Sequence, residues 1–360
     1  MKLRRLGIQL GLLCFTHPTM SAEYCIQPGD TPALLSALQD AASNGDDNSI
    51  FLAAGSYALD SDTPQLAYFS ATSQRLTIEG GYTAFFEGGC GKLVQYRAAD
   101  TVIDGAGGDH SASAITLFGS SGGRIELKFL KIQNAINTDP QGSSAVVLGQ
   151  AIGSEDVSVD LENTIFEGNI ALNYFPIRIG AAQTVIRNSV FAKTQVFGGF
   201  PQILANIDGM GTCAAILNST FVGNTGGSRA LELRAGMGCT PLIANSLFWG
   251  NSSGDLYLSM MSQSSVFLLN DDIHEFGSST DVTVNGQETL MSVNPLFVDA
   301  SAGNYALSDF SLLHDKGSSL ELIGGPGSFD VVGFKRTDGA SPDIGAFEIQ
   351  DVIFANGSDQ

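Results

Sequence analysis

A small group of charged and aromatic side chains alternates with aliphatic residues in short segments near the middle of the chain. Because alternate side chains of a strand point to opposite faces, the aliphatic residues should point inward and Arg178, Glu232, Arg234 and Tyr257 outward. An arginine beside a carboxylate and a tyrosine could serve a polysaccharide lyase, with arginine neutralising a uronate or acting as base and tyrosine offering a platform. The alternative is an ion pair between neighbouring strands and an ordinary exposed tyrosine.

A second candidate is the acidic segment Asn270-Asp271-Asp272-Ile273-His274. Paired acids of this kind are typical of inverting glycosidases. Adjacent residues of a strand point to opposite faces, which weakens that interpretation, and neither a Gly-His-Gly nor an Arg-Ile-Lys motif accompanies the acids. The alternative is a solvated variant of a repeated turn.

A third candidate is a calcium site formed by Glu155, Asp156 and Asp160. Carboxylates are suitable ligands for Ca²⁺, but these three lack the regular spacing of a calcium-binding loop. The alternative is an acidic surface. The sequence indicates no other cofactor, because no paired-cysteine or cysteine–histidine metal motif is present.

The N-terminus has the features of an export signal. Lys2, Arg4 and Arg5 precede the short apolar stretch 6–15, and we predict cleavage after Ala22. The stretch is too short to span a bilayer. Removing residues 1–22 takes three of the 17 basic residues and none of the 37 acidic ones, so the net charge changes from −20 to −23. Such a chain repels nucleic acid and anionic membranes, and also polyanionic polysaccharides unless a cation bridges the two.

Five segments resemble one another and define a repeat. Each has an aliphatic residue, an asparagine two positions later and a large apolar residue three positions after that, and successive asparagines are 25, 30, 27 and 25 residues apart. Such a period indicates a solenoid, in which one coil buries its apolar face only by stacking on the next. The asparagines are Asn163, Asn188, Asn218, Asn245 and Asn270, and the aromatic residues are Phe166, Phe191, Phe221 and Phe248.

We interpret both columns as structural. Asparagine tolerates the left-handed conformation of a sharp bend, and its amide can donate to one neighbouring coil while it accepts from the other. The sequence therefore predicts an asparagine ladder at the bend and a phenylalanine stack inside the tube.

The repeat predicts an all-β fold, a right-handed parallel β-helix with three strands per coil. The third strands are expected in segments 176–179, 202–205, 231–234 and 256–259. Open ends of such a solenoid need covering. We predict a short helix over residues 31–38 that is capped by Thr31, begins at Pro32 and plugs the N-terminal end with its leucines.

Four cysteines follow the signal, which indicates two disulfides with three possible pairings. Cys213 and Cys239 are 26 residues apart, close to one coil, which places them on adjacent strands about 4.8 Å apart. That separation suits a disulfide. The predicted pairs are therefore Cys213–Cys239 and Cys25–Cys90.

The C-terminal part resembles the terminal module of bacterial choice-of-anchor Q proteins. The likeness is carried by Asn294-Pro-Leu-Phe-Val-Asp299, Gly303-Asn-Tyr-Ala-Leu307, Asp315-Lys-Gly317 and Pro342-Asp-Ile-Gly-Ala-Phe-Glu348. Proteins of this family are right-handed parallel β-helices exported to the cell surface or the medium. The resemblance implies this fold and an extracytoplasmic bacterial setting, and it brings no catalytic residue with it.

The chain is thus predicted to comprise a signal peptide at 1–22, a β-helix with its N-terminal cap at 23–290, a C-terminal end module at 291–350 and a tail at 351–360. We expect a secreted or surface-exposed monomer that interacts with polysaccharide or cell-surface glycan, binds no nucleic acid and has no membrane span. The alternative is a polysaccharide lyase or glycoside hydrolase acting along the outer face of one sheet. The sequence leaves open whether the protein is an enzyme.

Overall fold

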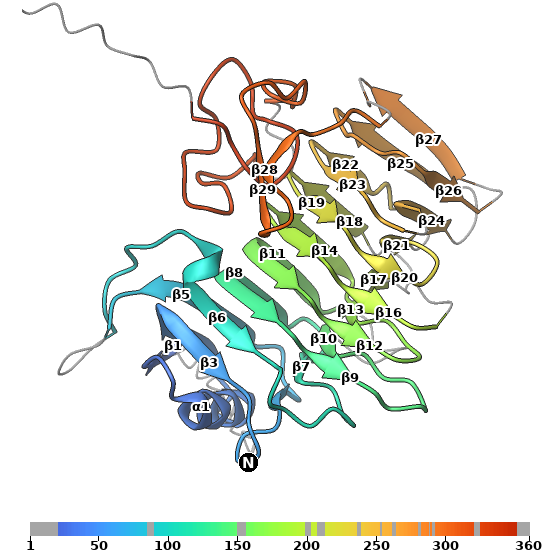
Figure 1. Ribbon diagram of the computed structural model, residues 1–360. Coiled ribbons are helices and arrows are strands. Elements are labelled where there is room, and N and C mark those ends of the chain that lie inside the picture. Colours follow the sequence, from blue (N-terminus) through green and yellow to red (C-terminus); the bar gives the residue numbers. More distant parts are fainter. Residues whose placement is uncertain are drawn as a thin grey trace, which may run out of the picture.

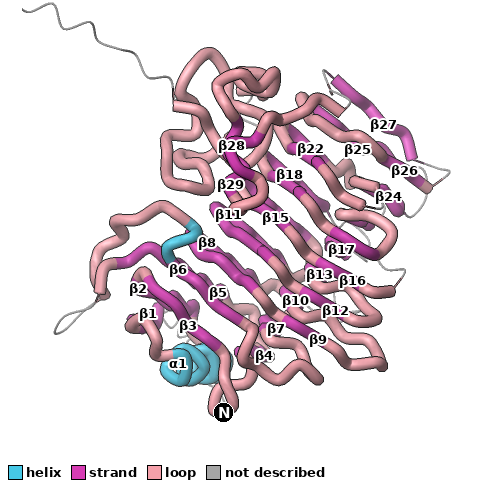
Figure 2. The backbone as a smooth tube through the Cα atoms, viewed as in Figure 1, coloured by secondary structure: helices cyan, strands magenta, loops and turns pink. Residues whose placement is uncertain are grey.

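The computed structural model describes residues 21–84, 90–149, 156–198, 203–206, 213–235, 239–252, 254–260, 264–279, 282–287, 289, 292–319 and 325–350. This part of the chain consists mainly of short strands, with the α-helix α1 (Thr31–Ser43) and the 3-10 helix η1 (Ala98–Asp100) (Figure 2). Most of the predicted signal and the tail lie outside the described residues. Ser21 and Ala22 are described and pair with Asp47 and Asn48 as the start of a strand, so cleavage after Ala22 would remove two paired residues.

The strands form three long parallel sheets and one antiparallel pair. The fifteen-stranded sheet contains β1 (Ser21–Ile26), β2 (Asp47–Ala53), β3 (Gly55–Ala58), β5 (Arg75–Tyr82), β6 (Thr101–Asp104), β8 (Arg124–Gln133), β11 (Ser158–Glu167), β14 (Gln183–Arg187), β15 (Val190–Ala192), β18 (Cys213–Leu217), β19 (Thr220–Val222), β22 (Leu242–Ala244), β23 (Leu247–Trp249), β25 (Ser264–Leu269) and β27 (Val282–Gln287). The eight-stranded sheet contains β4 (Leu66–Phe69), β7 (Ile115–Phe118), β10 (Val146–Gly149), β13 (Ile177–Gly180), β17 (Ile203–Asn206), β21 (Leu231–Ala235), β24 (Leu256–Met260) and β26 (Phe276–Ser278). The four-stranded sheet contains β9 (Ile136–Asn137), β12 (Ile170–Ala171), β16 (Gln195–Val196) and β20 (Thr225–Gly226), and the antiparallel pair is β28 (Phe297–Asp299) with β29 (Asn304–Leu307).

The chain visits the three parallel sheets in a repeated order. After β11 it passes through β12 in the four-stranded sheet and β13 in the eight-stranded sheet, and it returns to the fifteen-stranded sheet at β14 (Figure 1). The next coils repeat this path through β16 and β17, and then through β20 and β21. The fold is therefore all-β and solenoid-like, and the four predicted third strands are confirmed as β13, β17, β21 and β24.

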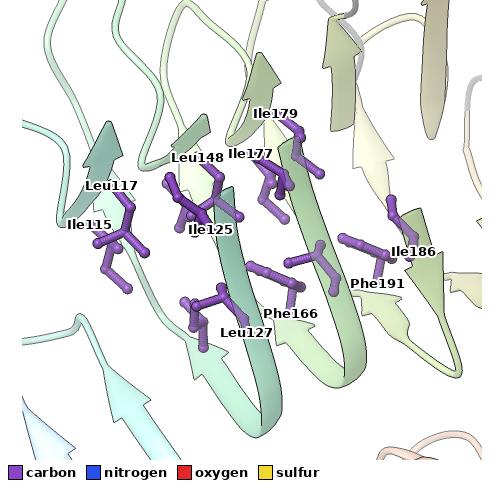
Figure 3. Close-up of a cluster of buried hydrophobic side chains, with 14 of the residues drawn as sticks. Ile115, Leu117, Ile125, Leu127, Leu148, Phe166, Ile177, Ile179, Ile186 and Phe191 are labelled. Carbon is purple, nitrogen blue, oxygen red and sulfur yellow. The ribbon is translucent and has the colours of Figure 1, made fainter. Parts of the chain in front are cut away.

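The core is a set of stacked apolar columns between the sheets (Figure 3). The predicted phenylalanine stack is confirmed, because rings of successive coils lie nearly parallel with centroids 5.0, 4.9 and 4.5 Å apart. The aliphatic residues two positions before each asparagine are buried in the same core. Stacking of identical residues in register explains why the repeat is readable in the sequence. These buried residues are Phe166, Phe191, Phe221, Phe248, Leu161, Ile186, Ile216, Ile243 and Leu268.

The asparagine column makes the predicted bends but not the predicted ladder. All five asparagines are left-handed, with φ between 48° and 53°. Their side chains turn toward the C-terminal module, by which we mean described residues 292–319 and 325–350. The amide nitrogens of Asn188, Asn245 and Asn270 donate to carbonyls of that module at 2.9–3.0 Å, and Asn163 donates to the carbonyls of Phe329 and Asp330. The ladder prediction was wrong because the module supplies closer acceptors.

Polar ladders exist instead at two neighbouring positions. The amide of Ser189 donates to Ser219 Oγ, that of Ser219 to Ser246 Oγ, and that of Ser246 to a carboxylate oxygen of Asp271. At the next bend, Asn224 donates through Nδ2 to Asn251 Oδ1 at 2.9 Å. The ladder chemistry was correctly expected but assigned to the wrong column.

The C-terminal module lies along the flank of the solenoid, beside β11 to β22 (Figure 1). It reaches from Lys316, which accepts from Asn270, back to Val331, whose carbonyl accepts from the amide of Ala98. Tyr96 stacks on Phe329 with centroids 4.1 Å apart. These contacts run along the side of the coils, whereas the sequence predicted a module at their C-terminal end.

The N-terminal helix plugs the first coils as predicted, with Leu34 and Leu38 packed into the core. It is longer than predicted, and its cap differs. Asp30 accepts from the amide of Ala33 at 3.1 Å, whereas the hydroxyl of Thr31 donates to the carbonyl of Ala58. The prediction of Thr31 as cap was wrong by one residue, because aspartate is as good a cap as threonine.

Both predicted disulfides are confirmed. Cys25 pairs with Cys90 and Cys213 with Cys239, with Cα–Cα distances of 5.1 and 5.3 Å. Cys213 begins β18, and the second bond spans 26 residues, about one coil, as the repeat predicts.

Candidate functional sites

The outer face of the eight-stranded sheet carries the four side chains singled out as a possible lyase site. Strand register places Arg178, Leu204, Glu232 and Tyr257 in one column across β13, β17, β21 and β24, with Arg234 in the adjacent column. The aliphatic neighbours point inward as predicted and are fully buried, namely Ile177, Ile179, Leu231, Leu233, Leu256 and Leu258.

The four side chains do not form one catalytic group. Arg178 is only 9% exposed and lies two strands from Glu232. Glu232 is engaged by Arg234, whose Nε lies 2.6 Å from Glu232 Oε1. The alternative interpretation predicted an ion pair between neighbouring strands. An ion pair is present, but both of its residues lie on β21. The guanidinium of Arg229 lies over the ring of Tyr257, with Cζ 5.8 Å from the ring centroid.

Two aromatic residues on the same face were missed by sequence reasoning. Phe69 on β4 is 59% exposed, and its ring contacts that of Phe118 on β7 edge to face, with centroids 5.4 Å apart. Both belong to the column that continues through Gly149 and Gly180. The alternation of side chains within segments 66–69 and 115–118 could have identified these two residues. It was not used, because these coils lack the asparagine repeat.

The two acids after Asn270 are both buried, but they lie in different environments. Asp271 is completely buried and accepts from the amides of Ser246 (2.8 Å) and Leu269 (2.9 Å), so it ends the serine ladder. Burial raises its pKa well above the usual range. Because Asp271 and Asp272 point to opposite sides, they are not the facing pair of an inverting glycosidase. Asp271 takes the place of the repeated serine, as the turn-variant alternative predicts, but it is buried rather than solvated.

Asp272 belongs to a different environment, at the seam between the last coils and the C-terminal module. Its Oδ1 accepts from the amide of Val293 at 3.0 Å, and burial raises the pKa of Asp272 to about 6. Beside it lies an open cavity of about 370 Å³ lined by Trp249, Gly250, His274 and Ser292. The hydroxyl of Ser292 is hydrogen-bonded to Nδ1 of His274.

A charged groove of about 210 Å³ lies on the outer face of the fifteen-stranded sheet. Arg124 Nε is 2.7 Å from Glu126 Oε1 and 2.6 Å from Asp160 Oδ2. The other charged residues of the lining are Lys128, Glu162 and Arg187. Asp160, a calcium candidate, is therefore an ion-pair partner. Asp156 is exposed, and Glu155 lies outside the described residues. The three calcium candidates are not seen to converge.

One histidine–carboxylate group within the described residues has metal-ligand spacing. Atoms of His314, Asp315 and Asp343 lie within 4.8 Å of one another. Both oxygens of Asp343 accept backbone amides, from Asp315 and Ile349, and Asp315 Oδ1 accepts from the amides of Ala340 and Ser341. Their role in the described geometry is to fasten loops of the C-terminal module.

Comparison with models of known protein families and with curated proteins finds no match for this chain. Neither helix in the described part of the chain has both the length and the apolar character that a membrane span requires.

Proposed function

We propose that this chain is an exported right-handed parallel β-helix protein of the choice-of-anchor Q type that binds glycan along the outer face of its eight-stranded sheet. The observation that carries the proposal is the line of outward side chains on that face, with Phe69 and Phe118 at one end, Tyr257 at the other, and the Glu232–Arg234 pair between them. Three parallel sheets visited in repeated order support the β-helix assignment.

The dimensions of this face suit an extended ligand. Six strand steps separate β4 from β24, which is about 29 Å at about 4.8 Å per step. Exposed aromatic rings offer rigid flat surfaces with a large apolar area, and polar groups between them can orient hydroxyl groups. A glycan chain lying across the strands would meet an aromatic ring near each end.

Charge favours a neutral glycan over an acidic one. The chain has 37 acidic and 17 basic residues, so a polyanion is repelled unless a cation such as Ca²⁺ bridges it. Two disulfides are compatible with an oxidising, extracytoplasmic compartment. These features support a secreted or surface-exposed protein that binds no nucleic acid, and we propose that it is a monomer.

The alternative function is a polysaccharide lyase or glycoside hydrolase acting on the same face. Arg178 is nearly buried and Arg234 is paired with Glu232, so neither presents the free guanidinium that a lyase base or uronate-neutralising group requires. For this reason we favour binding over catalysis on this sheet.

The test uses purified residues 23–360 with a panel of immobilised neutral and uronate polysaccharides, with and without calcium. We expect retention on a neutral polysaccharide, reduced at least tenfold in the double variant Phe69→Ala, Tyr257→Ala. The matched control is Phe310→Ala, because Phe310 is 85% exposed on the C-terminal module. Retention by the double variant equal to that of the control would contradict the proposal, and new reducing ends or unsaturated products would favour the enzymatic alternative.

A further inference from the structure

The cavity at the seam between the last coils and the C-terminal module brings together groups that the glycan-binding face does not use. Leu247 and Asp272 are bridged on adjacent strands, which places Trp249 beside His274 in the next outward column. Ser292 belongs to the segment that leads into the C-terminal module, and it meets His274 across the cavity. The cavity is therefore built by residues from three separate parts of the chain.

The hydroxyl of Ser292 is placed for activation by a histidine. Its Oγ is hydrogen-bonded to Nδ1 of His274, an arrangement that lets imidazole take the hydroxyl proton when Nε2 carries the ring hydrogen. Its backbone is left-handed, with φ of 57°, a conformation that costs a non-glycine residue on the order of 1 kcal/mol and that clusters at functional sites.

The surrounding structure holds Ser292 in place. The amide of the next residue, Val293, donates to Asp272 Oδ1, and Asp272 is almost completely buried. The other carboxylate oxygen of Asp272 is buried without a hydrogen-bond partner among the described residues. Asp272 thus anchors the backbone of the serine next to the histidine, in the manner of a positioning residue.

Gly250 supplies a backbone donor on the same cavity. In the preceding coils the equivalent amides of Gly168, Lys193 and Gly223 donate to a carbonyl of the next coil. Within the described part of the chain, the amide of Gly250 makes no such bond. Gly250 lines the cavity, and a Cβ built on it would meet nothing within 4 Å. An unpaired amide of this kind can stabilise an oxyanion.

We propose that this cavity hydrolyses short-chain carboxylic esters, with Ser292 as nucleophile, His274 as general base and the Gly250 amide as oxyanion donor. Ser292 Oγ bonds to the ester carbonyl carbon while His274 Nδ1 takes the hydroxyl proton. The alcohol leaves with that proton, and the acyl group stays on Ser292. Water then gives one proton to His274 and its oxygen to the acyl carbon. His274 returns that proton to Ser292 Oγ as the bond between Oγ and the acyl carbon breaks, which releases the acid and restores Ser292. Trp249 forms an apolar wall that suits a small acyl chain.

The experiment treats residues 23–360 with a fluorophosphonate, which modifies activated serines, and locates the adduct by peptide mass spectrometry. We expect labelling at Ser292, and hydrolysis of p-nitrophenyl acetate that falls at least 100-fold in Ser292→Gly and in His274→Asn. Glycine is chosen because it adopts the left-handed conformation without strain, and circular dichroism checks that each variant folds.

The matched controls are Ser301→Ala on an exposed loop and His110→Asn near the N-terminal coils, which should both keep wild-type labelling and turnover. Absence of labelling at Ser292 in the folded wild-type protein would overturn the proposal. Turnover that survives in Ser292→Gly, or labelling that survives in His274→Asn, would overturn it equally. The result does not depend on glycan retention, because Phe69 and Tyr257 lie on the eight-stranded sheet and do not line this cavity.

Discussion

The ladder of hydrogen bonds through Ser189, Ser219 and Ser246 ends at a single side chain, that of Asp271. In three coils a serine accepts the amide of the preceding coil and donates to a carbonyl two residues back, as Ser219 does with the carbonyl of Leu217 at 2.9 Å. Asp271 takes this position in the last coil and accepts two amides with its two carboxylate oxygens. Because it is completely buried, its ionised form loses hydration without gaining a cation.

We predict that Asp271→Ser is tolerated and that Asp271→Ala is not. Serine keeps an acceptor for the amide of Ser246 and removes the buried carboxylate, whereas alanine leaves that amide unsatisfied, at a cost of about 1–3 kcal/mol. Urea denaturation of both variants at pH 7 measures the difference in unfolding free energy. Equal destabilisation by serine and alanine would show that the carboxylate has a role other than ending the ladder.

The partners of the asparagine column could not be predicted from spacing alone. Asn163 donates to the carbonyl of Phe329, 166 residues away, and Asn218, with its amide oxygen turned to the guanidinium, accepts from Arg336 Nη2 at 2.6 Å. Periodicity identifies the residues that need a left-handed bend, but it carries no information on which distant carbonyl will compete for the amide. Similarly, Ser292 lies outside the regular repeat, so no register predicted its contact with His274.

The phenylalanine stack is the element that periodicity predicted best. The two middle rings each contact a ring on both sides, and Phe221 lies between Phe191 and Phe248 at 4.9 and 4.5 Å. The N-terminal coils were harder to predict, because Phe129 has φ of 52° and occupies the bend position that asparagine takes later. Phenylalanine does not indicate a left-handed bend, so the sequence contained no sign of the bend at Phe129.

We predict that Phe221→Ala destabilises the fold by about 3–5 kcal/mol, because the cavity left inside a stack of coils cannot collapse from either side. Thermal unfolding followed by circular dichroism measures the loss. The exposed Phe310→Ala variant should stay within about 0.5 kcal/mol of wild type. A loss below about 1 kcal/mol for Phe221→Ala would mean that neighbouring coils close over the gap.

A buried arginine holds the C-terminal module together and joins it to Asn218 on the flank. Arg336 is 1% exposed, donates to the carbonyl of Asp343 at 2.6 Å and lies 3.8 Å from Glu348 Oε2. It lies among the buried carboxylates of Asp330, Asp343 and Glu348, whose six oxygens all accept backbone amides. Removing the cation leaves these acids without their counter-charge.

We predict that Arg336→Ala loosens the module while the phenylalanine stack stays folded. The loss of a buried ion-pair partner costs about 3–5 kcal/mol, and the module depends on this contact more than the coils do. Hydrogen exchange should show faster exchange in residues 325–350 and unchanged protection in residues 158–192. The neighbouring exposed Lys335→Ala variant is the control, and equal exchange in the two variants would argue against the fastening role.

The molecule as a whole should respond to pH through these buried acids. Burial is the main cause that raises the pKa of Glu348 from 4.5 to about 7, and it also raises the pKa values of Asp330 and Asp343. Between about pH 4.5 and 7 the folded protein therefore binds more protons than the unfolded chain. Stability from this source is fully present below about pH 4.5 and is lost as the pH rises through about 7, by on the order of 3 kcal/mol for Glu348.

We predict that Glu348→Gln flattens this dependence, because glutamine keeps the shape of the side chain and cannot ionise. Urea denaturation midpoints at pH 5 and pH 8 should differ less in the variant than in wild type, with a residual slope from Asp330 and Asp343. The exposed Asp309→Asn variant should keep the wild-type slope. If Glu348→Gln also keeps that slope, Glu348 is already ionised at pH 5 in the folded protein, and the pairing with Arg336 outweighs the cost of burial.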